Sequence, residues 1–244
     1  MILSYVQIEE IAAATINDFN HFFFGGVAPR KKEMPRGTPI DQFAKDYLNL
    51  KVSFTKLSSD GSLCGVTAYC DTEYVVEESG LLRRIPLKRN QVLLDESFIH
   101  PAQVKKLCGK RRFTLAHECA HQILFQMESD DGKLACRKQY TERKAYSLRD
   151  LKTREDWNEW QANALGAAIL MPQSEIEFAV WRFAPNRILT SYDGYFTYQD
   201  RLALRLMCDV FKVSRAALII RLRQLGYLVD RPYSEFNDPM EVWA

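Results

Sequence analysis

The segment that most constrains the fold of this chain is His117-Glu118-Cys119-Ala120-His121, because two metal ligands at this spacing meet on a helix. Histidines four residues apart lie one helical turn from each other, so both imidazoles can reach a single metal ion. Glu118 lies one step round the helix, where its carboxylate can take a proton from water. The pattern therefore predicts a helix with two metal ligands and a general base. The alternative is a surface helix with two solvated histidines.

Length and composition are those of an ordinary globular protein. The chain has 244 residues, of which 47% are hydrophobic and 26% charged, so it can bury a core. Its net charge of +2 is too balanced to indicate nucleic-acid binding. No apolar run approaches the ~20 residues of a membrane span, and the N-terminus lacks a signal-peptide pattern. Six scattered cysteines without a Cys-x-x-Cys pair are typical of reduced thiols, so we expect a cytoplasmic protein without membrane partners.

Hydrophobic periodicity predicts an α+β fold. Helices are expected over residues 4–24, 38–48, from about 100 or 110 to 127, 157–171, and twice within 198–228. Ser214 is the expected N-cap of the last helix. Strands are expected at 51–57, 64–70, 73–76 and 91–95. The expected architecture is a small antiparallel sheet packed against the helix with the two histidines and a second ligand-bearing helix, with C-terminal helices beyond. Residues 128–154 are polar and predict a loop with short helical pieces.

A catalytic zinc ion usually has three protein ligands, so the two histidines need a partner. The best candidate is Glu159, which shares a helix face with Asn163 and Gly166. Asn163 could hold Glu159 or a histidine through a hydrogen bond. Small residues would let the two helices approach closely, namely Ala162, Gly166 and Ala167 on one and Ala116 and Ala120 on the other. The rival ligands are Glu142, Glu155 and Asp156, and Glu159 could instead be a solvated surface charge.

Two segments of the chain resemble the ImmA/IrrE family of zinc metallopeptidases, which are gluzincin-like. Residues 112–121 read Arg-Phe-Thr-Leu-Ala-His-Glu-Cys-Ala-His, and residues 159–172 contain Glu-x-x-Ala-Asn and end on Leu-Met-Pro. Weaker matches at 39–54 and 211–226 flank them. The chain departs from the family pattern at Cys119-Ala120, where relatives usually have Leu-Gly. The polar gap between the two helices also looks longer than in relatives, so it could be a lid or a recognition insert.

The resemblance implies an intracellular zinc-dependent metalloendopeptidase that takes part in transcription regulation. It implies Zn²⁺ ligands at His117, His121 and Glu159 and a catalytic base at Glu118. The implied partner is a protein substrate, a helix-turn-helix repressor or a similar regulator. The expected domains are an N-terminal helix and loop at 1–38, a metallopeptidase domain at 39–197, and a C-terminal helical subdomain at 198–244 packed on it.

Two other functions compete with proteolysis. A zinc-binding regulator or sensor without catalytic activity could use the same ligands to bind a repressor or DNA. A DNA-binding module is the second rival, because residues 202–225 resemble a helix-turn-helix and have five arginines nearby: Arg201, Arg205, Arg215, Arg221 and Arg223. For a peptidase, an extended substrate could add to an exposed strand at 92–95. Four tyrosines are candidates for stabilising the oxyanion: Tyr140, Tyr146, Tyr192 and Tyr195.

Overall fold

The fold is α+β, as the sequence predicted, in a computed structural model that describes residues 2–26, 34–78, 81–129, 133 and 154–237. The chain forms two compact units. The first contains Met1–Thr15 and Pro39–Leu170, and the second contains Ile16–Thr38 and Met171–Ala244. The expected division at 38/39 and 197/198 into three parts stays a prediction.

Most helices of the first unit lie where the sequence predicted them, but the short helix at Glu96–Ile99 was not predicted. They are the N-terminal part of α1 (Tyr5–Phe24), α2 (Ile40–Gln42), which continues as the π-helical η1 (Phe43–Tyr47), η2 (Glu96–Ile99), α3 (Val104–Met127) and α5 (Arg154–Leu170). The backbone N–H of Leu3 donates to Gln161 Oε1 at 2.6 Å, and the rings of Tyr5 and Trp160 pack edge to face at 4.7 Å. These contacts hold the start of the chain against α5.

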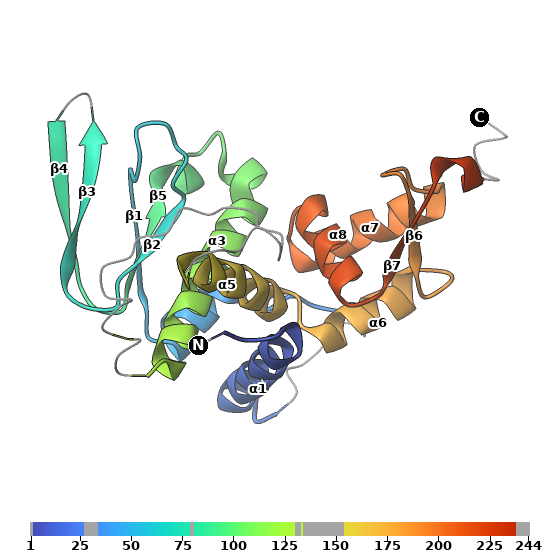
Figure 1. The fold of residues 1–244 in the computed structure, drawn as a ribbon, viewed down its shortest axis with the longest axis horizontal. Coiled ribbons are helices and arrows are strands. Elements are labelled where there is room, and N and C mark those ends of the chain that lie inside the picture. The colour runs from blue at the N-terminus through green and yellow to red at the C-terminus, as the bar shows by residue number, and fades with distance from the viewer. Residues whose placement is uncertain (1, 27–33, 79–80, 130–132, 134–153, 238–244) are drawn as a thin grey trace. The chain divides into compact units, whose positions relative to one another are not determined.

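A three-stranded sheet in the order β1-β5-β2 lies beside α3 in the first unit (Figure 1). Its strands are β1 (Lys51–Thr55), β5 (Gln91–Asp95) and β2 (Gly65–Thr67). β2 pairs antiparallel with β5, as expected, but β1 pairs parallel with it, so the sheet is mixed. The expected substrate edge at 92–95 was also wrong, because β5 is the central strand and both of its sides are paired.

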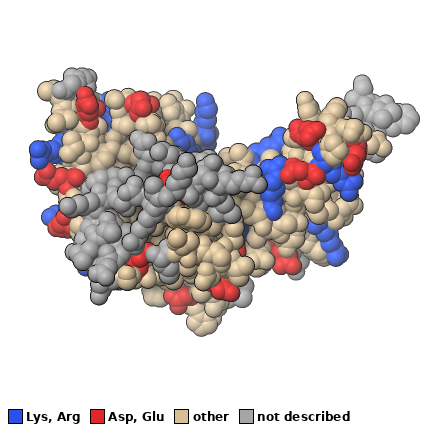
Figure 2. Space-filling model, viewed as in Figure 1, with Lys and Arg blue, Asp and Glu red and all other residues tan. Residues whose placement is uncertain are grey.

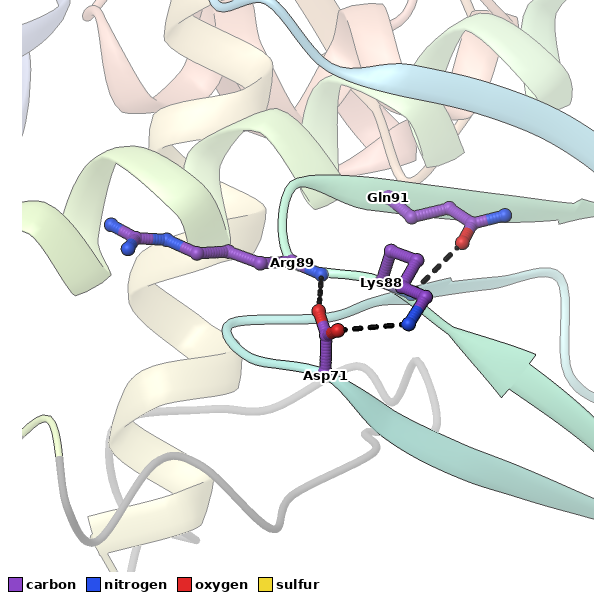
Figure 3. A network of polar contacts seen from close by, with 4 residues as sticks. All are labelled: Asp71, Lys88, Arg89 and Gln91. Atoms are coloured by element: carbon purple, nitrogen blue, oxygen red, sulfur yellow. Dashed lines mark hydrogen bonds and ion pairs between the residues drawn. The ribbon is translucent and has the colours of Figure 1, made fainter.

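An antiparallel hairpin of β3 (Thr72–Glu78) and β4 (Leu81–Leu87) follows β2. Part of β3 was predicted from the sequence, and β4 was not. Six buried side chains join the hairpin to the sheet: Leu57, Leu63, Val66, Ala68, Leu87 and Leu93. Figure 3 shows how polar contacts fix the turn that leads from the hairpin into β5. Asp71 accepts hydrogen bonds from Lys88 Nζ and the Arg89 backbone N–H, both at 2.9 Å.

The second unit contains more structure than the sequence predicted. Its elements after residue 170 are α6 (Gln173–Phe183), β6 (Leu189–Tyr192), α7 (Tyr198–Phe211), α8 (Arg215–Gln224), β7 (Leu228–Arg231) and η3 (Tyr233–Glu235). α7 and α8 were predicted, and Ser214 caps α8 as expected, because its side chain accepts the Ala217 N–H at 3.2 Å. α6 and the parallel pair β6–β7 were not predicted.

The charges on the surface are mixed, as the nearly balanced net charge of +2 predicted. Figure 2 shows basic and acidic side chains interspersed over the described part of the face in view. Among the described residues, no helix has the length and apolar character that a membrane crossing requires.

Candidate metal centre

Close packing of α3 against α5 builds the candidate site within the first unit. Gly166 makes the approach possible, because a Cβ there would lie 3.0 Å from the His117 backbone nitrogen and 3.1 Å from the Ala116 carbonyl carbon. Ala116 and Ala120 are fully buried on the facing helix. The close contact at Gly166 agrees with the prediction that small residues let the two helices approach each other.

Three side chains from these helices converge on one point: His117, His121 and Glu159. The two Nε2 atoms are 3.0 Å apart, and Glu159 places Oε2 3.4 Å from His117 Nε2 and Oε1 3.0 Å from His121 Nε2. All three side chains are buried. They form a group that could hold a metal ion, and within the described part of the chain no other group of three such residues does so.

The geometry of the group fits a zinc ion. Tetrahedral coordination with bonds of ~2.1 Å separates ligand atoms by ~3.4 Å. The observed separations of 3.0 to 3.4 Å are close to this value. Within the described residues, neither oxygen of Glu159 accepts a well-aligned hydrogen bond, although the side chain is only 3% exposed. A buried carboxylate normally has such partners, so its lone pairs are available to a cation between the three groups.

Electrostatics favour a charged Glu159. Burial opposes ionisation, but the two imidazoles hold the pKa of Glu159 well below its usual range. Burial likewise works against a charged His121, yet the Glu159 carboxylate raises the pKa of this histidine above its ordinary value. Glu159 therefore supplies the negative charge that a site with two neutral imidazoles requires for a divalent cation.

Glu118 lies on α3 between the two histidines and faces β2. Its side chain is 3% exposed, and burial raises its pKa to about 8, with the nearby Glu159 carboxylate adding to the effect and His121 opposing it. A carboxyl group whose pKa lies near neutral pH can both accept and return a proton. Glu118 is thus suited to proton transfer beside the three candidate ligands.

The contacts between α3 and residues 65–69, in β2 and directly after it, were not anticipated from the sequence. Gln122, next to His121, donates from Nε2 to Thr67 Oγ1 at 2.6 Å and to the Ala68 carbonyl at 3.1 Å. A Cβ on Gly65 would lie 2.6 Å from Glu118 Oε1. The rings of Tyr69 and Phe125 stack at 4.3 Å. In the sequence, the only sign of these contacts was a glutamine, Gln122, directly after the second histidine.

The other candidate residues have different outcomes. Asp156 is half-buried on α5 and is outside the group of three. Glu142, Tyr140, Tyr146 and the side chain of Glu155 lie outside the described part, as does most of the polar segment 128–154. Asn163 is half-buried one turn after Glu159, and its role as a supporting residue stays a prediction. Tyr192 and Tyr195 belong to the second unit.

The cysteine inside the motif is a core residue. Cys119 is fully buried, and burial raises the pKa of its thiol well above the ordinary value. A neutral buried thiol is neither a good metal ligand nor a reactive group. The five described cysteines are free thiols.

In comparisons with known proteins, no family model matches the chain and no curated protein is similar enough to count as a relative. The geometry of the site and the two sequence segments that form it therefore carry the functional argument.

Proposed function

We propose that the protein is a zinc-dependent metalloendopeptidase. The observation that carries the proposal is the convergence of His117, His121 and Glu159 on one buried point, with the Glu118 carboxylate beside them. A structural zinc site usually has four protein ligands, whereas a catalytic site keeps a position open for water or substrate. Three ligands and a neighbouring general base are the set that peptide hydrolysis needs.

In the proposed mechanism, three residues would hold the zinc ion and a fourth transfers the proton. A zinc ion held by the two imidazoles and Glu159 would polarise a peptide carbonyl and lower the pKa of water to about 7. The Glu118 carboxylate accepts the proton of the attacking water and then donates it to the leaving amine. Burial of the site excludes bulk water and strengthens these electrostatic effects.

The substrate class rests on the family resemblance. Residues 112–121 and 159–172, which resemble the ImmA/IrrE metallopeptidases, are the segments that form the site. Members of that family whose role is known act in the cytoplasm and cleave, or are thought to cleave, helix-turn-helix repressors. We propose the same location and a repressor or similar regulatory protein as the substrate.

A zinc-binding regulator without catalytic activity is the alternative, since the same three ligands would serve it. Glu118 argues against this alternative, because a sensor does not need a buried carboxyl group beside the three ligands. Burying such a group costs stability, so its presence is better explained by proton transfer.

Direct DNA binding by the α7–α8 pair has less support from the structure. Arg221 is 1% exposed, and its Nε donates to the Met171 carbonyl at 3.1 Å. Arg223 forms a bidentate pair with Asp230, with both contacts at 2.7 Å. The Arg215 guanidinium lies 5.0 Å from the centre of a phenylalanine ring in the same unit. Arg221 is thus buried, and the exposed Arg223 and Arg215 each have a partner within the same unit.

Cleavage of a helix-turn-helix repressor by wild-type protein and by Glu118→Gln tests the proposal. Wild-type protein should give specific fragments, identified by mass spectrometry. Glu118→Gln should bind zinc with wild-type stoichiometry and give no fragments. Wild-type rates of cleavage by Glu118→Gln would refute the role of Glu118, whereas an intact complex between wild-type protein and the repressor would favour the regulator.

A further inference from the structure

Gly65 on β2 has a close contact that its backbone conformation does not explain. Its φ is not in the left-handed region, so another residue could adopt the same backbone. A glycine in a strand often marks a place where another part of the structure comes close to the backbone. A Cβ at this position would lie 2.6 Å from Glu118 Oε1, 3.2 Å from Glu118 Cδ and 2.6 Å from Thr114 Cγ2. These distances are too short for van der Waals contact.

The strand has little freedom to move away from α3. Gly65 pairs with Leu94 on β5, which fixes one side of β2. The two hydrogen bonds from Gln122 to Thr67 and Ala68 fix the other end of the strand to α3. A side chain added at Gly65 would therefore have to displace its neighbours on α3.

Of those neighbours, the Glu118 carboxylate is the one that would move. The Thr114 hydroxyl donates to the Lys110 carbonyl at 3.0 Å, which holds the Thr114 side chain in place. The Glu118 carboxylate is at the free end of a longer side chain and can rotate about its bonds. It is nevertheless 3% exposed, so any displacement takes it out of its present position beside the metal ligands.

We infer that Gly65 is a positioning residue for Glu118, because its missing side chain leaves the space in which the Glu118 carboxylate is held against β2. This inference rests on the proposed function, since it concerns the residue that transfers the proton. Gly65 is not expected to act on the candidate metal ligands themselves. The three atoms nearest to a Cβ at Gly65 belong to Thr114 and Glu118, not to the candidate metal ligands.

Kinetics of Gly65→Ala give the first test. A displacement of about 1 Å at a reacting group can cost on the order of 100-fold in rate. We expect Gly65→Ala to lower kcat by about that factor, to leave KM within about twofold, and to bind zinc as tightly as wild type. Gly166→Ala is the matched control, because its added methyl group meets the His117 backbone and should weaken zinc binding instead. A wild-type kcat, or a loss of zinc in Gly65→Ala, would overturn the inference.

A double-mutant cycle in metal-free protein gives a test that does not depend on activity. The unfolding midpoint is measured for wild type, Gly65→Ala, Glu118→Ala and the double variant. Gly65→Ala should lower the midpoint clearly in the wild-type background and less in the Glu118→Ala background, where the carboxylate is gone. An equal decrease in both backgrounds would overturn the inference.

The two tests also separate this inference from the proposed function. If Gly65→Ala does not fold, recovery of folded protein on adding Glu118→Ala counts as coupling, and failure in both backgrounds counts against it. If the wild-type protein neither binds zinc nor cleaves protein, the proposed function fails while the stability cycle still decides whether Gly65 and Glu118 are coupled.

Discussion

Replacing Gly166 by alanine would add a methyl group at the point where the two ligand-bearing helices are in closest contact. The added methyl group would lie 3.0 Å from the His117 backbone nitrogen and 3.2 Å from the Ala116 carbonyl oxygen. Backbone atoms cannot rotate away, so α3 and α5 must separate by a few tenths of an ångström. Because metal sites tolerate errors of only ~0.2 Å in ligand distance, we expect zinc affinity to fall by about 10- to 100-fold.

The change in the free energy of unfolding is the difference between a gain in helix propensity and a cost of overpacking. Alanine gains about 1 kcal/mol over glycine from helix propensity. Overpacking a buried contact costs about 1–3 kcal/mol. The free energy of unfolding should therefore decrease by about 0–2 kcal/mol, in contrast to the increase that propensity alone predicts.

Denaturant unfolding of metal-free protein and a competitive zinc titration measure the two effects. Asn158→Ala is the matched control, because Asn158 is half-buried on the same helix and its replacement gains helix propensity without adding atoms. The control should keep wild-type zinc affinity and be as stable as wild type or slightly more stable. Gly166→Ala that is stabilised by about 1 kcal/mol and binds zinc normally would refute the close-packing argument.

Three further variants test the hydrogen bonds and the ion pair that stabilise each of the two units. Gln122→Ala should lower the free energy of unfolding by about 1–3 kcal/mol in denaturant titrations, because it removes two buried hydrogen bonds, one to the Thr67 hydroxyl and one to the Ala68 carbonyl, which keeps the Asn90 N–H as a donor. Asp41→Asn should cost about 0.5–1 kcal/mol at neutral pH, because the bidentate pair with Arg111 is partly exposed. Hydrogen bonding from Arg111 lowers the pKa of Asp41, so its contribution is complete above the ordinary pKa of 3.8 and is lost as the pH falls further; a gap between the two proteins that widens in acid would contradict this. Arg221→Ala should cost more than about 2 kcal/mol, since it opens a cavity and removes the donor to a buried carbonyl.

The helical part of the site could be read from the sequence because its signals are local. Residues at i and i+4 share a helix face whatever the rest of the fold does, so His117 and His121 follow from spacing alone. Small residues on two amphipathic segments indicated a close approach, and Gly166 provides it. Glu159 needed more than spacing, because a glutamate on a helix is usually solvated.

The strand pairing could not be read in the same way. The direction in which β1 pairs with β5 depends on the path of the chain between them, and a five-residue strand carries no record of it. β6 and β7 are four residues each and lie far apart in sequence, so neither gave a period-two signal. Pro172 was read as a helix stop, and it is also the residue before α6.

Gly65 shows why supporting residues escape a sequence reading. A glycine within an apolar run indicates a weak point or a bulge, and only the position of Glu118 gives it a purpose. Gln122 is similar, because its partners at Thr67 and Ala68 are more than 50 residues away. Residues that hold a site together act through tertiary contacts, which a single sequence does not display.

The zinc content of purified wild-type protein and of Glu159→Ala tests the central claim most directly. The side chains of His117, His121 and Glu159 should bind one zinc ion per chain, and Glu159→Ala should bind it at least about 10-fold more weakly. A wild-type protein that takes up no stoichiometric zinc, or a Glu159→Ala variant with unchanged affinity, would contradict the three-ligand site on which the proposed peptidase activity depends.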